Sequence, residues 1–295
     1  MFCCRERTCF VPFPAEICYT INITERRGNF IMIQRVDRLL ASTGRWSRTQ
    51  AKDVIRAGRV QINGESIRDP AAKTDADTAV ILVDGAPLDC RRFTWIMLNK
   101  PAGYLSATED GRGTTVMDLL TPELRRRGVF PVGRLDKDSE GLLLLTNDGL
   151  SAHRLLSPKN HVDKVYFIRV SGRLNDADAA ALASGTLALD GKPCLPARLE
   201  ILSTGIHGEN DPAPADMPLP DLRTYSEALL TLREGKYHQA KRMLAKLGKP
   251  VRYLERVKMG NLPLDLSLER GSFRFLTDSE RENLLACTAV PEKDL

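Results

Sequence analysis

The chain has 295 residues, of which 42% are hydrophobic and 27% charged, as is typical of an ordinary soluble globular protein. No apolar run approaches the roughly 20 residues of a transmembrane helix, which argues against a membrane protein. The formal net charge of +5 is modest, so an anionic partner such as RNA has to be judged from the local distribution of charge. A chain of this length predicts two domains, one small and one larger.

The first 33 residues precede the first clear pattern, and we expect a poorly ordered tail there. Arg5, Glu6 and Arg7 stand where a signal peptide needs its apolar segment, so the tail does not predict secretion. Its cysteines lack the paired C-x-x-C spacing of a zinc site, and the remaining cysteines are scattered. This usage favours a reduced, cytoplasmic protein. Met32 is a candidate for the true start.

Residues 34–92 predict two short helices followed by a hairpin. The segment "RVDRLLASTG" places its apolar residues at helical spacing and ends in glycine. Ser47 and Gln50 then form a capping box at the start of a second helix. An alternating segment leads into Asn63-Gly64, the strongest short signal for a hairpin.

Basic side chains outnumber acidic ones in this module. The candidates for contacts with RNA are Arg38, Arg45, Arg48, Lys52, Arg56 and Arg59. Four of these residues recur at spacings of three and four, so they can line one face of the second helix: Arg45, Arg48, Lys52 and Arg56. Such a ridge follows RNA phosphates well, because each neutralised phosphate releases counterions. A solvated helix face has the same pattern, and the charges alone leave both interpretations open.

Three short motifs cover nearly all of this module. They are R-x-D-x-L-L at its start, S-R-x-x-A-K in the second helix and G-R-V-x-I-N-G in the hairpin. Together they resemble an S4 RNA-binding domain, a small α/β module found in ribosomal proteins, tRNA synthetases, RNA chaperones and rRNA-modifying enzymes. The resemblance implies an RNA partner and leaves the chemistry to the rest of the chain.

Residues 93–290, after a linker at 90–92, interleave strands and helices. Strands are predicted at 95–98, 142–146, 164–172, 225–235 and 251–264, and helices at 114–120, 150–157, 175–185 and 236–248. Residues 99–103 are expected to leave the sheet because of Pro101 and Gly103. Residues 203–224 are rich in Pro, Gly, Asp and Asn and predict an exposed loop. The irregular order predicts an α+β fold with a mixed, mainly antiparallel sheet flanked by helices.

The stretch "PVGRLDKDSEGLLLLTNDG" places a charged loop directly before four leucines, Leu142 to Leu145. Asp136 is flanked by Arg134 and Lys137, and neighbouring cations favour an ionised carboxylate that can act as nucleophile or base. A solvated turn residue is the commoner explanation for a lone aspartate of this kind. Motifs for nucleotides, metals or a serine nucleophile are absent from the sequence, so we expect neither cofactor nor metal.

Four segments occur in an order familiar from one enzyme family. They are "LNKPAGYLSATED", "FPVGRLDKDSEGLLLLTNDG", "SPKNHVDKVYFIRV" and "EGKYHQAKRMLAKLG". With the front module, residues 35–277 resemble pseudouridine synthases of the small-subunit rRNA type. The G-R-L-D segment is the most specific part, and the YHQ-x-KRM helix favours the small-subunit branch. The resemblance implies an S4 domain at 34–92 followed by a pseudouridine synthase domain at 93–290.

The resemblance also implies roles for individual residues. Asp136 matches the family's nucleophilic aspartate, which attacks C1′ of the ribose or C6 of the uracil. Arg134 matches a residue that helps to hold the flipped nucleotide. Tyr166 matches a tyrosine that stacks on the base, although its spacing alone predicts a core aromatic. Lys241 matches the basic partner of the nucleophile.

Three residues of the last predicted helix have less specific roles. Lys236 and Arg242 are expected to bind phosphate, and Leu244 either packs beneath the base or belongs to the core.

Taken together, the matches imply a monomeric isomerase that makes pseudouridine in 16S rRNA or in a small-subunit assembly intermediate. Two alternatives remain: the same reaction on 23S rRNA, and a non-catalytic S4-type RNA-binding or ribosome assembly factor. The combination of Asp136 with Tyr166 and Lys241 favours the enzyme, because a binder needs no such set.

Overall fold

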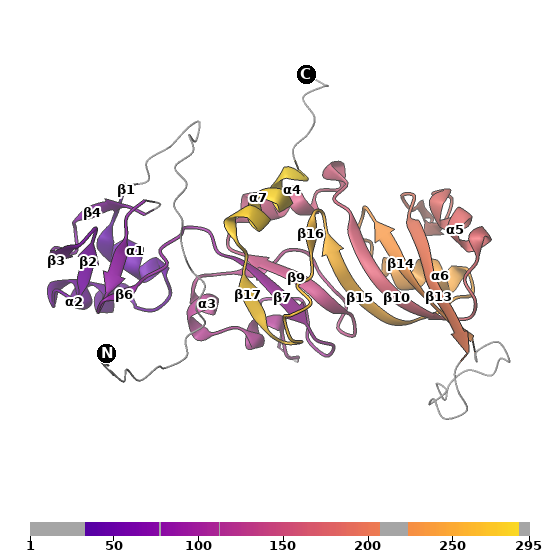
Figure 1. The fold of residues 1–295 in the computed structure, drawn as a ribbon, viewed down its shortest axis with the longest axis horizontal. Coiled ribbons are helices and arrows are strands. Elements are labelled where there is room, and N and C mark those ends of the chain that lie inside the picture. The colour runs from indigo at the N-terminus through magenta and orange to yellow at the C-terminus, as the bar shows by residue number, and fades with distance from the viewer. Residues whose placement is uncertain (1–32, 77, 112, 207–223, 289–295) are drawn as a thin grey trace, which may run out of the picture.

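The computed structural model describes residues 33–288, apart from 77, 112 and 207–223. A small N-terminal domain stands beside a larger domain built on one long sheet (Figure 1). The predicted tail lies outside the described residues except for Ile33, which begins strand β1 (Ile33–Arg35). Most of the predicted polar loop also lies outside them. Its described ends, Ser203–Ile206 and Thr224, belong to strands, so the prediction of a loop was wrong there.

The small domain has the predicted order of two helices and a hairpin. Its helices are α1 (Val36–Ser42) and α2 (Arg48–Arg56), and its further strands are β2 (Val60–Ile62), β3 (Glu65–Ile67), β4 (Lys73–Asp75), β5 (Ile81–Val83) and β6 (Ala86–Pro87). The capping box of Ser47 and Gln50 is present at the start of α2. Asn63 and Gly64 both have positive φ, at 52° and 88°, as a tight hairpin turn requires. The apolar faces of both helices pack on β2 and β5 as one core.

Within the described residues, the larger domain forms one nine-stranded sheet in the order β13-β14-β10-β15-β9-β7-β17, with β8 on β9 and β16 on β15. Its strands are β7 (Trp95–Lys100), β8 (Phe130–Pro131), β9 (Glu140–Thr146), β10 (Lys164–Ser171), β13 (Arg198–Ile206), β14 (Thr224–Leu232), β15 (Val251–Met259), β16 (Leu262–Pro263) and β17 (Phe273–Phe275). The pairing of β9 with β15 is parallel, and the other described pairings are antiparallel. The mixed, mainly antiparallel sheet is therefore confirmed.

Helices cover both faces of this sheet. The remaining elements are η1 (Val116–Leu119), α3 (Pro122–Arg126), α4 (Gly149–Leu156), η2 (Pro158–Asn160), α5 (Asp176–Ala183), β11 (Ala188–Leu189), β12 (Lys192–Pro193), α6 (Gln239–Lys246) and α7 (Asp278–Ala286). Leu143 and Leu145 pack in the cluster that contains α5 and α6, whereas Leu142 and Leu144 pack with α4 and α7. The four leucines are consecutive because β9 is buried on both faces.

Two local predictions need correction. Asn99 and Lys100 were expected in a turn, but β7 continues through Lys100, which pairs with Gly141 of β9. The chain leaves the sheet one step later, at Pro101, which lacks the backbone donor needed to extend the ladder. The predicted helix at 114–120 is a single 3-10 turn, η1, capped by Thr115.

Two arginines at the end of α3 connect the domains. Nε of Arg126 donates to the carbonyl of Gly44 (2.5 Å), and Nε of Arg127 donates to that of Thr43 (3.0 Å). Arg127 also donates to the carbonyl of Asp89 in the linker (2.6 Å). These bonds hold the end of α1 against the larger domain.

No helix in the described part of the chain is long and apolar enough to cross a membrane.

Candidate active site

Asp136 lies in the loop between β8 and β9, directly before the buried leucine strand. Its side chain is 23% exposed and faces the start of α6. Nζ of Lys241 lies 3.5 Å from Oδ2 of Asp136, and Nε2 of His238 lies 3.5 Å from Oδ1. A partly shielded carboxylate is thus held between the side chains of a lysine and a histidine, both supplied by the start of α6.

A second carboxylate, Asp138, fixes the ammonium group of Lys241. Nζ of Lys241 donates to Oδ1 of Asp138 at 2.5 Å. Partial burial opposes ionisation of Asp138, but the hydrogen bond and charge of Lys241 outweigh it and hold the pKa of Asp138 below its ordinary value. Lys241 therefore bridges two carboxylates, and this bridge fixes the distance between its charge and Asp136.

Lys100 anchors the backbone of the Asp136 loop from below. Its side chain is fully buried at the end of β7. The ammonium group contacts four backbone carbonyls: Pro101 (3.1 Å), Asp136 (3.1 Å), Lys137 (3.2 Å) and Ser139 (2.7 Å). Burial lowers the pKa of Lys100 to about 8. Because one cation gathers these carbonyls, the loop presents the Asp136 side chain from a fixed backbone.

The helix that supplies Lys241 is itself firmly seated. Ala240, Met243 and Leu244 recur at helical spacing and are buried against the sheet, which leaves Lys241 on the side of α6 that faces the loop. Gln239 ties the preceding turn down, since its amide donates to Glu234 (2.6 Å) and its oxygen accepts from the backbone of Lys236 (2.9 Å).

The sequence of this chain matches two known families. Residues 94–246 match the RNA pseudouridylate synthase family, and residues 34–77 match the S4 domain. The chain belongs to the RNA pseudouridylate synthase family. It is therefore an RNA isomerase, and the S4 domain predicted at its front is confirmed.

Relatives of this synthase match it over nearly their full length. An uncharacterized RNA pseudouridine synthase of Bacillus subtilis is 45% identical over 246 residues, covering 83% of this chain and 96% of its own. Ribosomal small subunit pseudouridine synthase A of Haemophilus influenzae is 35% identical over 252 residues, covering 85% and 99%. A crystal structure of a pseudouridylate synthase is 35% identical, with a TM-score of 0.55 over 85% of this chain and 99% of its own.

Tyr166 lies on β10, on the face of the sheet that α6 covers. Its side chain is 9% exposed and belongs to the same core cluster as Leu135, the neighbour of Asp136, and Leu244 of α6. Its cross-strand neighbour on β15 is Arg256. The structure thus places Tyr166 in the core beneath the loop and helix that carry Asp136 and Lys241, and Leu244 in that core as well.

The other predicted residues near this site differ in how they are engaged. Arg134 is exposed on the Asp136 loop. Lys236 donates to the carbonyl of Pro193 (2.5 Å), and Arg242 forms an ion pair with Asp190 (2.5 Å). A phosphate would have to compete with these internal partners at Lys236 and Arg242, whereas Arg134 is directly accessible.

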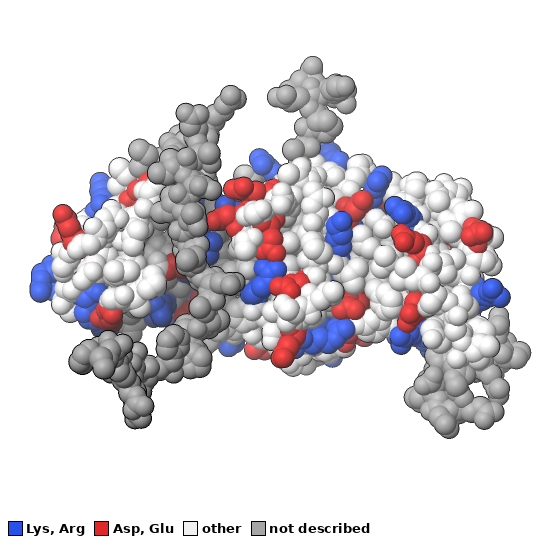
Figure 2. Space-filling view, in the orientation of Figure 1, with Lys and Arg blue, Asp and Glu red and all other residues white. Residues whose placement is uncertain are grey.

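The predicted basic ridge of the small domain borders a hollow of about 750 Å³. Arg38, Arg45 and Arg48 line it, and Arg126 of the larger domain joins them. The guanidinium of Arg45 lies 5.6 Å from the centre of the Trp46 ring. Lys52 and Arg56 continue along α2, and Arg59 is paired with Asp84. Figure 2 shows basic side chains at the edge of this domain.

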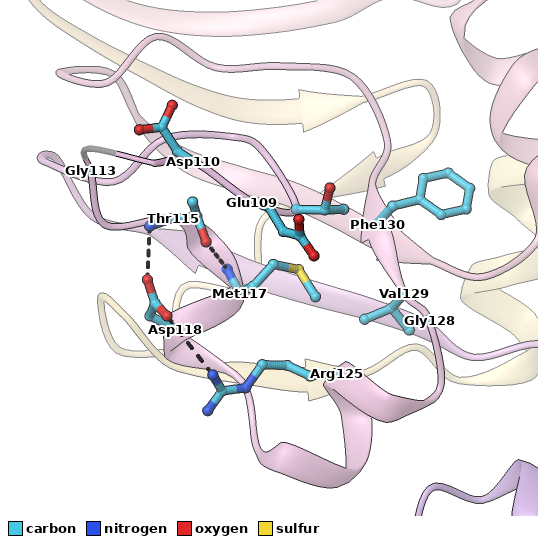
Figure 3. Close-up of a pocket in the computed structure, with 11 residues that line it drawn as sticks. Glu109, Asp110, Gly113, Thr115, Met117, Asp118, Arg125, Gly128, Val129 and Phe130 are labelled. Carbon is cyan, nitrogen blue, oxygen red and sulfur yellow. Dashed lines mark hydrogen bonds and ion pairs between the residues drawn. The ribbon is translucent and has the colours of Figure 1, made fainter.

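A second hollow, of about 590 Å³, lies beside η1 and α3 (Figure 3). Glu109, Asp110 and Asp118 line it, and Asp118 accepts a hydrogen bond from the backbone of Thr115 and lies 3.9 Å from Arg125. Acidic walls repel RNA phosphates, so this hollow is a poor RNA site.

In the described part of the chain, no three His, Cys, Asp or Glu side chains form a group that could hold a metal.

Sequence reasoning missed two residues of the site, His238 and Lys100. His238 was given no role from the sequence, yet it stands three positions before Lys241, one helical turn away. Lys100 was predicted to lie in a turn. A lysine that directly follows an apolar strand and precedes a proline is, however, unusual, and this position could have indicated a buried lysine. Both act through contacts with a loop that is distant in sequence.

Proposed function

We propose that this synthase converts one uridine of 16S rRNA to pseudouridine, with Asp136 as the nucleophile. The observation that carries the proposal is the Asp136 carboxylate, partly exposed and held 3.5 Å from both Lys241 and His238 on a loop gathered by Lys100. A residue of a merely solvated turn would not need this support.

The reaction moves one bond and leaves the oxidation state unchanged. Asp136 attacks C1′ of the ribose or C6 of the uracil, and the bond between C1′ and N1 breaks. The uracil turns, C1′ joins C5, the proton on C5 is lost, N1 gains a proton and the carboxylate is released. Lys241 places its positive charge beside the Asp136 carboxylate, Tyr166 stacks on the base, and Arg134 holds the phosphate of the flipped nucleotide.

Binding has to offset the cost of extruding the uridine. Taking a nucleotide out of its stack costs a few kcal/mol. Stacking on an aromatic side chain returns roughly 1–3 kcal/mol per base, and basic contacts with phosphate add affinity that depends on salt. The ridge of the S4 domain supplies such contacts at a distance from the reacting atoms. Leu135 of the charged loop packs in the same core cluster as Leu143 and Leu145 of β9, so the loop that carries Asp136 is anchored on an apolar core.

The choice of small-subunit rRNA as the substrate is supported by the names of related proteins. Proteins named ribosomal small subunit pseudouridine synthase A from Haemophilus influenzae and Vibrio vulnificus are 35% and 34% identical to this chain over nearly their full length. These names favour 16S rRNA over 23S rRNA. We place the reaction in the cytoplasm, where rRNA is assembled into ribosomal particles, with a single copy of the chain as the active unit.

One assay separates the alternatives. Purified protein is incubated with unmodified 16S rRNA, with a small-subunit assembly intermediate and with 23S rRNA, and pseudouridine is then mapped by chemical labelling and reverse transcription. Modification of one uridine in 16S rRNA, free or in the particle, supports the proposal. Modification of 23S rRNA alone refutes the substrate, and tight binding without any modification points to the non-catalytic assembly factor.

A further inference from the structure

Two aromatic rings are stacked at the edge of the active site. Tyr237 and His238, in the turn before α6, have ring centres 3.9 Å apart and planes inclined by 16°. Tyr237 is 72% exposed, the largest exposed fraction among the phenylalanine, tyrosine and tryptophan side chains in the described part of the chain. A large ring left in water next to a catalytic carboxylate requires an explanation, because aromatic rings are usually well buried.

The stacked pair is held in place from several directions. The backbone of His238 is left-handed, with φ 47° and ψ 37°, a conformation that is uncommon for a residue other than glycine and that is found at functional sites. Its Nε2 lies 3.5 Å from Asp136, while the carbonyl of Tyr237 accepts a hydrogen bond from Arg242 (3.4 Å). The ring of Tyr237 is therefore separated from the nucleophile by one imidazole only.

The surroundings of Tyr237 fit a nucleotide better than a protein partner. Four basic residues lie close to it in sequence, of which three are engaged by acceptors of the protein and Lys246 follows on the same helix: Lys236, Lys241, Arg242 and Lys246. A protein-docking surface would need a contiguous apolar patch, but Tyr237 is the one exposed large apolar residue between 224 and 259, all of which are described. A lone ring in a basic setting is the arrangement that proteins use to stack the bases of single-stranded nucleic acid.

We propose that Tyr237, backed by the imidazole of His238, is a stacking platform for the nucleobase next to the target uridine. This inference rests on the proposed function and adds a second base-binding position to it. When the target uridine leaves its stack, the adjacent base loses a stacking partner. Tyr237 replaces that partner at the edge of the site. The base belongs to an adjacent nucleotide because only two short contacts, of 3.9 Å and 3.5 Å, separate the Tyr237 ring from Asp136.

The test uses short RNAs that contain the modified uridine with 2-aminopurine on its 5′ or its 3′ side. Stacking on a ring quenches the fluorescence of 2-aminopurine. We expect the wild type to quench the probe on one side, Tyr237→Phe to do so equally, and Tyr237→Ala to lose the quenching and about tenfold in affinity. Phe275→Ala, which removes an exposed ring on β17, is the matched control and should change neither readout.

A second set of RNAs tests the contact between the Tyr237 ring and the flanking base directly. An abasic nucleotide replaces the neighbour on either side, and binding by wild type and Tyr237→Ala is measured. On the side where Tyr237 stacks, the two changes together should cost no more affinity than either alone. Additive losses on both sides, or equal binding by Tyr237→Ala and wild type, would overturn the platform. Thermal unfolding curves show whether each variant is folded.

The failure of the platform can be told apart from the failure of the proposed function. If the wild type makes pseudouridine and Tyr237→Ala binds and quenches as well as it does, the platform is wrong and the enzyme assignment stands. If the wild type quenches a flanking probe but modifies no rRNA, the isomerase proposal is wrong and the platform stands as part of a binding site. At saturating RNA we expect the kcat of Tyr237→Ala to stay within about threefold of wild type while KM rises, since the platform binds a base that does not react.

Discussion

Nζ of Lys241 lies 3.5 Å from Oδ2 of Asp136 and 2.5 Å from Oδ1 of Asp138, so one ammonium group joins the loop before β9 to the start of α6. Strands β10, β13 and β14 all intervene along the chain. This ion pair brings together the charged loop and the basic helix that the sequence singled out separately.

Replacement of Asp136 by asparagine should abolish isomerisation and leave RNA affinity within about threefold of wild type. The amide has nearly the same shape, but it cannot form the covalent link to the nucleoside. Single-turnover modification and filter binding on the same RNA measure the two effects. Asp176→Asn is the matched control, because it changes an exposed carboxylate at the start of α5, outside the site. Normal turnover by the Asp136 variant would show that another group attacks.

Replacement of Lys241 by methionine should raise the pKa of Asp138, because the variant lacks the hydrogen bond and the charge that lower it. The carboxyl resonance of Asp138, followed by NMR over pH 2 to 7, measures this shift. Turnover should fall at least tenfold, since Asp136 is deprived of the same cation. Lys241→Arg keeps the charge and should recover part of both effects. A pKa of Asp138 that does not change would mean that the ion pair is absent in solution.

Removal of Lys100 should change the pH dependence of stability. The pKa of Lys100 is about 8 in the folded protein and 10.5 ordinarily, so between these values the unfolded chain binds more protons and folding gains stability as pH rises. The free energy of unfolding of the wild type should therefore rise relative to Lys100→Met by roughly 1–2 kcal/mol from pH 7 to 9.5. Urea unfolding at both pH values measures it. A difference that stays constant would contradict the buried charge.

Replacement of Arg45, Arg48 and Arg56 by alanine should weaken RNA binding and flatten its dependence on salt. On single-stranded RNA, every phosphate that the variant no longer neutralises lowers the slope of log K against log salt by about 0.7. Binding is measured from 50 to 300 mM salt. Exposed arginines of the larger domain, changed together as Arg154, Arg173 and Arg198, serve as the control. Equal slopes for the two triple variants would mean that the ridge of the S4 domain is an ordinary solvated helix face.

Local features of this chain could be predicted because they depend on neighbours in sequence. The capping box of Ser47, the Asn63-Gly64 turn and the buried run from Leu142 to Leu145 are all present as expected. Each depends on backbone preferences or burial patterns that a few residues fix by themselves. The G-R-L-D segment likewise pointed to Asp136 through its resemblance to a family.

The parts that sequence reasoning missed depend on interactions between distant segments. Lys100 was expected in a turn and is instead buried with its charge on the carbonyls of the Asp136 loop. His238 was given no role from the sequence, and the structure places its Nε2 3.5 Å from Oδ1 of Asp136. The sequence by itself determined most helices and strands, the S4 module and the choice of Asp136 as the candidate carboxylate. These features depend on neighbouring residues or on short motifs. Only the tertiary structure decided which cations meet that carboxylate, because the packing of β9 and α6 on the common sheet fixes those distances.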